Sequence, residues 1–212
     1  MSYDGAPAAV ASAARRGLGR PPTADPESIA DAALTLLVEQ GYDNVTMDQI
    51  AQAANVSRST LFRLFPTKSA ALWGHRREYL SNYRRLLAER PVAESLGRSL
   101  IEAQRAIDRV DTSRRALYRQ RMLMVQENQG GATAELWSVY EELCGCVVEH
   151  VHARRPGLPR SSADMIGRMA WAGMWGAIVS WAQSGEESLD PFYDELLPHL
   201  ERLDPERVLL RR

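Results

Sequence analysis

The sequence predicts an all-α protein, built as a three-helix head followed by a larger helical bundle. Apolar residues recur every three or four positions in each periodic segment, which is the spacing of one face of an α-helix. No segment alternates apolar and polar residues over the length of a strand. Hydrophobic residues make up 45% of the 212 residues, enough for a folded core.

The first 24 residues are expected to form a flexible basic arm. They are rich in Ala, Gly and Ser and carry Arg15, Arg16 and Arg20. Their string RRGLGRPP resembles the Gly-Arg-Pro core of segments that insert into an AT-rich minor groove, where arginine is favoured. A solvated tail without a DNA contact is the equal alternative.

The first helix is expected to begin at Pro26 or Glu27. Asp25 is suited to cap it, and proline is favoured at the first helical position. Apolar residues such as Ile29 then follow at helical spacing. Gly41 ends the helix, because glycine adopts the backbone conformation that follows a helix C-terminus.

The next segment, TMDQIAQAANVSRSTLFRLFPTK, predicts two short helices joined by a tight turn. Thr46 and Gln49 have the spacing of a capping box at the start of the first helix. Asn55 tolerates the left-handed conformation of a turn, and Ser57 caps the second helix. Pro66 ends that helix, because the residue before a proline is disfavoured in the α region. This layout is a helix-turn-helix.

Residues 27–72 resemble the DNA-binding domain of the TetR family of bacterial transcriptional regulators. The resemblance is carried by the first helix, ESIADAALTLLVEQGYDNV, and by STLFRLFPTKSAAL at Ser59–Leu72, where the family has a pattern close to STLYRYFPSKEAL. It implies that residues 25–72 form a DNA-binding domain. Phe62 departs from the family's usual tyrosine, so a hydroxyl contact to phosphate is not expected there.

In a helix-turn-helix the second helix lies in the major groove, and its N-terminal residues meet base edges. We therefore expect Arg58 and Ser59 at the bases, with Arg63 one turn further, because arginine pairs bidentately with guanine. The resemblance implies phosphate contacts from Lys68 and from two threonines. A solvated helix face is the alternative for the arginines. The residues expected at the DNA are Thr46, Ser57, Arg58, Ser59, Thr60, Phe62, Arg63 and Lys68, with Arg15, Arg16 and Arg20 of the arm.

The charge distribution fits a basic head on an acidic body. The whole chain has a net charge of −1, but residues 57–90 contain eight basic and two acidic side chains, a net +6. Such a patch attracts phosphate through one face of the molecule. Lys68 is the only lysine in the chain, and it stands at a helix start, where phosphate is favoured.

Residues 73–212 predict a helical body for ligand binding and dimerisation. A long helix that starts in the head is expected to bridge the two parts, and prolines, glycines and cap residues separate the helices that follow. The expected helices cover residues 67–89, 93–110, 114–129, 132–154 and 163–183, with a last one after Pro191.

The segment MIGRMAWAGMWGAIVSW, within residues 163–183, is apolar on nearly every side and must be buried on several. In the resembled family the last two helices pair with their twins in a four-helix dimer interface. The resemblance thus implies a homodimer formed by residues 163–203. A helix at the centre of a monomer core is the alternative.

Large aromatic and sulfur-containing side chains in the body are suited to line an adaptable apolar pocket. Ordinary core packing is the alternative for each of them. The residues expected at such a pocket are Met122, Trp137, Tyr140, Trp171 and Trp175.

The strings SRRALYRQRMLMVQE and WGHRREYLSNYRRLLAERP resemble the subgroup of the family that includes the mycofactocin-associated regulator, a subgroup associated with fatty acyl-CoA thioesters. This resemblance implies a hydrophobic, anionic effector such as an acyl-CoA, with Arg119 or Arg121 near its head group. It also gives Arg114 and Arg115 a role near CoA phosphates. A solvated basic face is the alternative.

Cys146 and His150 are four residues apart, with Cys144 and His152 close by, which allows a thiol- or metal-based redox sensor as the alternative function. The two cysteines point about 200° apart on a helix, and no second cluster completes four ligands. We therefore expect buried thiols that pack as small hydrophobic groups, and no metal.

Together these observations predict a ligand-responsive regulator, a repressor that binds a palindromic DNA operator as a homodimer and is released by a hydrophobic small molecule. No catalytic spacing or phosphate-binding loop stands out, so we expect no enzyme activity and no cofactor. No apolar leader follows Met1 and no run of eighteen apolar residues occurs, which favours a cytoplasmic protein without a membrane partner.

Overall fold

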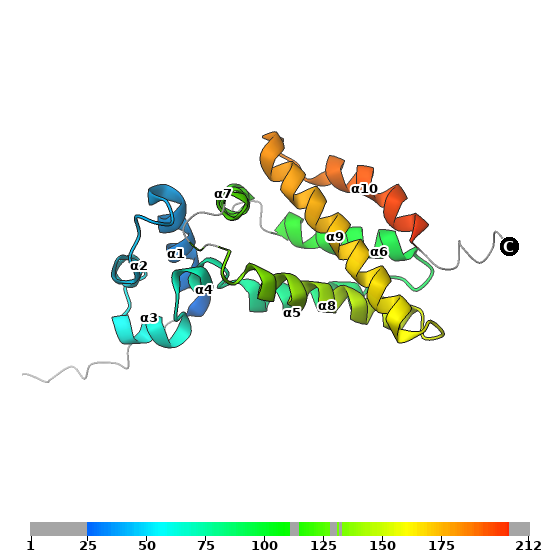
Figure 1. Ribbon diagram of the computed structural model, residues 1–212, viewed down its shortest axis with the longest axis horizontal. Helices are drawn as coiled ribbons and strands as arrows, with labels where there is room; N and C mark the ends of the chain where they lie inside the picture. The colour runs from blue at the N-terminus through cyan, green and yellow to red at the C-terminus, as the bar shows by residue number, and fades with distance from the viewer. Residues whose placement is uncertain (1–24, 111–114, 128–130, 132, 204–212) are drawn as a thin grey trace, which may run out of the picture.

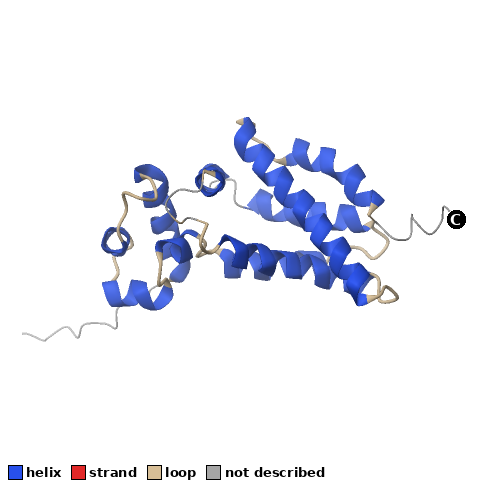
Figure 2. Cartoon of the chain, in the orientation of Figure 1, coloured by secondary structure: helices blue, strands red, loops and turns tan. Residues whose placement is uncertain are grey.

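The computed structural model describes residues 25–110, 115–127, 131 and 133–203, and within this part every regular element is a helix (Figure 2). The predicted all-α fold is confirmed. Helices α1–α4 lie at one end of the molecule and are called the head here, and α5–α10 form the body (Figure 1). The helices are α1 Pro26–Gln40, α2 Met47–Ala53, α3 Arg58–Leu64, α4 Lys68–Leu72, α5 Arg76–Ala88, α6 Leu96–Val110, α7 Arg115–Gln126, α8 Leu136–Arg154, α9 Arg160–Ser184 and α10 Asp190–Arg202.

Local hydrogen bonds build the head as the sequence predicts. The Asp25 side chain accepts from the first backbone N–H groups of α1. Thr46 and Gln49 form the full capping box of α2, with the Thr46 N–H donating to Gln49 Oε1 at 2.7 Å. Asn55 turns the chain with a φ of 52°, and Ser57 caps α3. These contacts fix the angle at which α3 leaves the turn.

The helix predicted over residues 67–89 is two helices in the structure, separated at Trp73–His75. Gly74 explains the break, since a Cβ at this position would lie 2.4 Å from the Cβ of Ala30 in α1. Glycine is a weak helix former and allows this close approach. Helix α4 therefore packs on α1, whereas α5 starts anew and enters the body.

The body is built around the antiparallel pair α8 and α9, which shares the most extensive helix contact in the described chain (Figure 1). Gly167 permits this packing, because a Cβ there would lie 2.6 Å from Val148 Cγ2. Helix α10 covers α6 and α9, and α7 bridges α9 and α1. The observed helices start or end a few residues from the predicted bounds. Within the described residues, no helix combines the length and the apolar character that a bilayer span requires.

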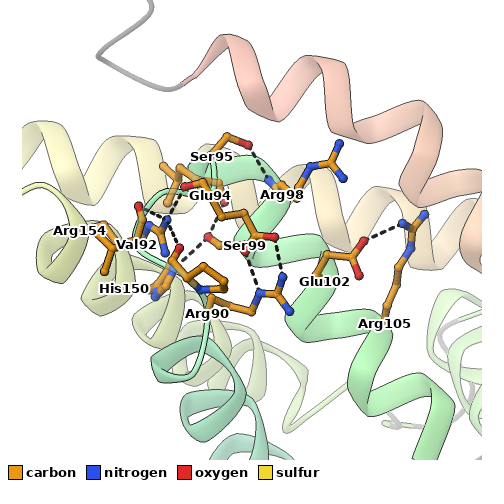
Figure 3. A network of polar contacts seen from close by, with 12 residues as sticks. Arg90, Val92, Glu94, Ser95, Arg98, Ser99, Glu102, Arg105, His150 and Arg154 are labelled. Atoms are coloured by element: carbon orange, nitrogen blue, oxygen red, sulfur yellow. Dashed lines mark hydrogen bonds and ion pairs between the residues drawn. The ribbon is translucent and has the colours of Figure 1, made fainter.

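A polar network fastens the α5–α6 loop to α8 (Figure 3). Arg90 forms a two-pronged pair with Glu94, and Arg154 of α8 donates to three backbone carbonyls of the loop, those of Pro91, Val92 and Glu94. One turn further along, Ser99 and His150 are hydrogen-bonded at 2.9 Å. This network fixes α6 and α8, two elements that frame the body.

Candidate DNA-binding surface and ligand cavity

The outer face of α3 carries the side chains predicted to meet DNA bases. Leu61 is fully buried and anchors the helix, while Arg58, Ser59 and Arg63 are exposed, as is 38% of Phe62. Positions 58, 59, 62 and 63 share one helix face. The structure therefore brings these four residues together on one solvent-facing surface.

Arg58 is held in place by two neighbours. Its Nε lies 3.2 Å from the Asp48 carboxylate of α2, and its guanidinium lies 5.3 Å from the centre of the Phe62 ring. Both members of the ion pair are more than 60% exposed, so the pair contributes little to stability. The sequence reasoning missed Asp48 as a neighbour of Arg58, although the pairing of basic and acidic residues on adjacent helices is a signal for it.

The hydroxyl groups predicted at phosphates serve first as helix caps. Ser57 Oγ accepts from the Thr60 N–H at 3.1 Å and is hydrogen-bonded to both Ser59 Oγ and Thr60 Oγ1. The Thr46 hydroxyl donates to Gln49 Oε1 at 2.8 Å. These contacts orient the start of each helix of the motif.

Lys68 lies against the head rather than in open solvent. Its Nζ donates to the Tyr42 carbonyl at 2.6 Å and lies 4.5 Å from the centre of the Tyr42 ring. The ammonium therefore clamps the turn after α1, and two of its three N–H groups are left for other acceptors. Arg15, Arg16 and Arg20, predicted to reach the DNA from the arm, lie outside the described residues.

A cavity of about 310 Å³ opens between the head and the body. Its position matters because it combines a residue of the head, Leu34 of α1, with α5, α6, α7 and the end of α9. The lining residues are Leu34, His75, Glu78, Tyr79, Asn82, Arg85, Leu86, Ala106, Ile107, Arg115, Tyr118, Arg121, Trp181 and Leu189.

A second cavity of about 50 Å³ continues toward the aromatic core of α8 and α9. The two cavities share His75, Tyr79, Tyr118 and Arg121, which form the wall between them. The smaller cavity is also lined by Trp73, Arg76, Leu80, Val139, Leu143, Trp171 and Trp175.

The predicted ligand residues are only partly at these cavities. Arg121 lines both, and Trp171 and Trp175 line the smaller one. Met122 is fully buried in the core instead and lines neither cavity. Trp137 is 71% exposed and stacks on Tyr140 with ring centres 5.7 Å apart, so this pair extends an aromatic cluster at the surface.

The four body arginines also separate in the structure. Arg115 lines the larger cavity, whereas Arg119 lies over the Trp181 ring at 4.5 Å and lines neither cavity. Arg114 lies outside the described residues. Arg119 and Arg121 face in different directions because two residues rotate a helix by about 200°.

The sequence reasoning missed the α5 side of the cavity. Tyr79 and Asn82 lie one turn apart on α5, and Tyr118 of α7 stacks on Trp181 with ring centres 6.0 Å apart. Tyr79 donates its hydroxyl proton to Gln104 of α6 at 2.6 Å. The signal for this wall was the tyrosine and asparagine at helical spacing within an arginine-rich helix.

Arg121 has an unusual environment in this wall. Its guanidinium lies 4.7 Å from the Trp73 ring centre and 4.8 Å from that of Tyr118, and its Nε is buried without a hydrogen-bond acceptor. Burial lowers the pKa of Arg121, while Tyr118 and Tyr79 act in the opposite direction. Arginine nevertheless remains charged in proteins. The wall therefore holds a buried positive charge.

Cys144 and Cys146, the candidates for a sensor site as an alternative function, both lie on α8. Both thiols are buried and free, and burial raises the pKa of Cys146 to about 11, which leaves it unreactive at neutral pH. His150 is turned toward Ser99, and burial lowers its pKa to about 4. Among the described residues no cluster of three potential ligands for a metal ion occurs.

Helix α9 exposes an apolar stripe that runs along the body. Met165 and Met169 are 59% and 56% exposed, and Ala172 and Gly176 continue the same face. A Cβ at Gly176 would meet no atom within 4 Å, whereas one at Gly173 would lie 3.0 Å from Leu196 Cδ1 of α10. Gly173 therefore faces its own α10, and Gly176 faces outward.

Comparisons with known proteins agree with this architecture. Residues 29–71 match the family model of the bacterial regulatory proteins of the tetR family. MftR of Mycobacterium tuberculosis, a proposed transcriptional regulator of mycofactocin biosynthesis, is 32% identical over 108 residues, which are 51% of this chain and 54% of MftR. YdeS of Bacillus subtilis, an uncharacterised helix-turn-helix regulator, is 41% identical over 46 residues, 22% of this chain and 23% of YdeS. The matches thus span about half or less of these relatives' lengths.

Solved structures share the fold over most of the chain. GusR of Salmonella enterica has a TM-score of 0.59 at 21% identity, covering 89% of this chain and 98% of GusR. The TetR-family repressor FadR of Thermus thermophilus, in complex with lauroyl-CoA, has a TM-score of 0.58 at 23% identity, covering 83% and 93%. FadR of Bacillus subtilis, in complex with stearoyl-CoA, has a TM-score of 0.62 at 13% identity, covering 83% and 97%. The head of this chain thus matches the tetR family model over residues 29–71, and the chain shares its overall fold with these solved regulators.

Proposed function

We propose that this protein is a repressor that binds a palindromic DNA operator as a homodimer and releases it when a hydrophobic, anionic molecule occupies the cavity between head and body. The observation that carries this proposal is the position of the cavity. It is lined by Leu34 of the DNA-binding head as well as by the body. An occupant is therefore in contact with both parts.

DNA recognition is assigned to the exposed face of α3. Arg58 and Ser59 stand at the N-terminal end of the helix, where base edges are met, and Arg63 follows one turn later. Ser57, Thr60 and Lys68 are proposed to hold phosphates with the donors that capping and the Tyr42 clamp leave available, whereas Thr46 would have to turn its hydroxyl proton from Gln49 Oε1 to a phosphate oxygen. The Phe62 ring lies against the guanidinium of Arg58 and offers an apolar contact to a thymine methyl group.

The route from cavity to head runs through His75. Its side chain lines both cavities, and its Nε2 lies 3.1 Å from the Asp31 carboxylate of α1. The α4–α5 break at Gly74 lies next to it and is the natural hinge. A ligand that displaces His75 would move α1, and with it α3. Release then follows if the ligand favours the arrangement that fits DNA less well.

Dimerisation is assigned to the apolar stripe of α9, with α10 beside it. A pair of recognition helices must reach half-sites about one DNA turn apart, which requires two heads. Gly176→Arg should then give a monomer by light scattering, because it places a long cation in the middle of the stripe. Gly173→Arg should instead lower thermal stability, since its Cβ already meets α10. A monomeric unmodified protein would refute this assignment.

The effector class rests on the cavity lining and on the solved neighbours. The lining is mostly apolar but includes Arg115 and Arg121. Two FadR proteins with the same fold were solved with lauroyl-CoA and stearoyl-CoA. Acyl-CoAs are therefore the first effectors to test.

Selection from a random DNA pool tests the DNA-binding function and identifies the operator at the same time. The unmodified protein should enrich a palindromic site, and lauroyl-CoA or a related amphipathic anion should weaken binding to it in a fluorescence anisotropy titration. Enrichment of no site would overturn the proposal. A site that is bound but insensitive to every amphipathic anion would overturn the effector part alone.

A further inference from the structure

Arg121 differs from Arg76 and Arg85, two other arginines at the body cavities, in lacking a carboxylate partner. Arg76 lies 3.3 Å from Glu135, and Arg85 lies 2.9 Å from Glu89. Within the described residues, no carboxylate pairs with Arg121, whose neighbours are the rings of Trp73 and Tyr118. Removing a charge from water without a counter-ion costs several kcal/mol. If Arg121 served packing alone, the protein would be more stable with methionine or leucine at this position.

The lining of the larger cavity carries charges of both signs. Glu78 lines the cavity and is exposed, and its carboxylate lies close enough to Glu27 to raise the pKa of Glu27 together with the burial of that group. An anion is disfavoured beside Glu78. The buried cation is at the wall that the larger cavity shares with the smaller one. The negative group of a ligand therefore belongs at Arg121.

Much of the remaining lining is apolar. The aliphatic side chains around the cavity include Leu86, Ile107 and Leu189, and Tyr118 and Trp181 add flat aromatic faces. A volume of about 310 Å³ is at the lower end of the range of small-molecule pockets, about 300–1,000 Å³. The cavity thus suits a medium-sized ligand.

We propose that the ligand of this cavity is a medium-sized apolar carboxylic acid, whose carboxylate binds the guanidinium of Arg121 at the inner wall. This proposal rests on the function proposed above, in which the cavity is the effector site, and it narrows the effector to a free acid. The planar guanidinium and a carboxylate match in a two-pronged hydrogen bond. An acyl-CoA has a thioester in place of the carboxylate. Its CoA part also carries several phosphate charges, whereas the inner wall of the cavity offers one buried cation.

Decanoate, decanol and decanoyl-CoA are suitable probes for the full-length protein. They share the ten-carbon chain and differ in the group at its end. Binding is measured by isothermal titration and by the fluorescence of Trp73 and Trp181, which line the cavities. Decanoate should bind at least tenfold more tightly than decanol, because a hydrogen bond to a charged group contributes more than one to a neutral group.

Variants of two arginines on the same helix separate an anion site from a structural role. Arg121→Met should weaken decanoate binding by roughly ten- to a hundredfold, and Arg121→Lys should recover part of it. Arg119→Met is the control on the same helix: Arg119 lines neither cavity but lies over the Trp181 ring, so this variant should weaken decanoate binding much less than Arg121→Met does. The melting temperature of ligand-free Arg121→Met should stay the same or rise, because the variant no longer buries a charge.

The outcomes distinguish this proposal from the proposed function. Equal decanoate affinity in the unmodified protein and Arg121→Met would overturn the carboxylate site. Binding of decanoyl-CoA but not decanoate would also overturn it, while leaving an effector-controlled repressor intact. Decanoate binding that depends on Arg121 but leaves operator affinity unchanged would support the site and refute the coupling.

Discussion

Arg58 in the head and Arg121 in the body both lie against aromatic rings, with their guanidinium groups 5.3 Å from Phe62 and 4.7 Å from Trp73. Arg58 is 68% exposed and shares its charge with Asp48. Arg121 is part of a buried wall without a carboxylate partner among the described residues. DNA can replace the partner of Arg58 at little energetic cost, because water already screens that pair. An anion that enters the cavity should stabilise the charge of Arg121 more than DNA stabilises the charge of Arg58.

The head and the body also differ in how completely their apolar side chains are packed. The core of the head surrounds Leu61, Ile50 and Leu37 completely, whereas the body leaves a cavity beside Ile107 and Leu86 that reaches the head only at Leu34. The head is thus a filled platform that presents a fixed surface. The body contains a cavity that a ligand can fill, and the unfilled cavity lowers the packing energy of the ligand-free protein. Mutations should therefore affect the two regions to different extents.

The largest effect is expected from core truncation in the head. Leu61→Ala should lower the free energy of unfolding by about 2–5 kcal/mol, because it opens a cavity in a fully packed site. Ile107→Ala is the matched change in the body and should cost less, since Ile107 already borders an open space. Urea denaturation of both variants measures the difference. Equal losses would contradict the contrast between a filled head and a hollow body.

Acid should destabilise the body through His150. Its pKa is about 4 in the folded protein, against an ordinary value of 6.5, so the unfolded chain binds a proton first as pH falls. The contribution of neutral His150 is fully present above pH 6.5 and is lost between pH 6.5 and 4, a change of about 3 kcal/mol.

The check is the pH dependence of unfolding in His150→Gln. Glutamine retains a donor for Ser99 but does not titrate, so the stability of this variant should fall less steeply below pH 6.5 than that of the unmodified protein. His199→Gln, at an exposed position of α10, is the control and should keep the original slope. Parallel slopes for His150→Gln and the unmodified protein would rule out His150 as the titrating group.

The junction between head and body should be sensitive to one methyl group. Gly74→Ala places a Cβ 2.4 Å from the Cβ of Ala30, which cannot turn away, so the variant should lose about 1–3 kcal/mol of stability. Gly145→Ala in α8 is the control, because a Cβ there meets no atom within 4 Å and alanine favours the helix. In thermal melting, Gly74→Ala should lower the melting temperature and Gly145→Ala should raise it. A stabilised Gly74→Ala would mean that α4 and α5 can join into one helix.

The head could be predicted from the sequence because its contacts are local. Thr46 and Gln49 lie three residues apart, and the cap at Ser57 follows the same rule, so short spacings reveal the helix ends. The cavity could not be predicted this way. Its wall joins Tyr79 and Tyr118, which are distant in sequence, and the break at Gly74 depends on the distance to Ala30. Hydrophobicity marked Met122 and Trp137 equally, although packing buries one and exposes the other.

Operator recognition should depend on Arg58 more than on its acidic partner. Arg58→Ala should weaken binding to the selected operator by about 1–3 kcal/mol and relax the preference at one base pair, because the bidentate contact to guanine is lost. Lys68→Ala should weaken all DNA sequences alike and also lower thermal stability, since the Tyr42 clamp is removed. Gel-shift titrations with the operator and with a scrambled sequence separate these two patterns. If neither variant lost operator binding, the assignment of α3 to the DNA interface would be wrong.

The smallest effect is expected from Asp48, and it tests whether the head holds Arg58 only loosely. Asp48→Ala removes an exposed ion pair that contributes at most about 1 kcal/mol, so operator affinity should change by less than that amount. The change should be a gain, because a carboxylate near the phosphates is removed and Arg58 stays supported by Phe62. In the Arg58→Ala background the same substitution should again favour binding to both operator and scrambled DNA. A loss of several kcal/mol on Asp48→Ala would mean that Asp48 itself reads a base, as acidic residues do at cytosine, and that Arg58 positions it.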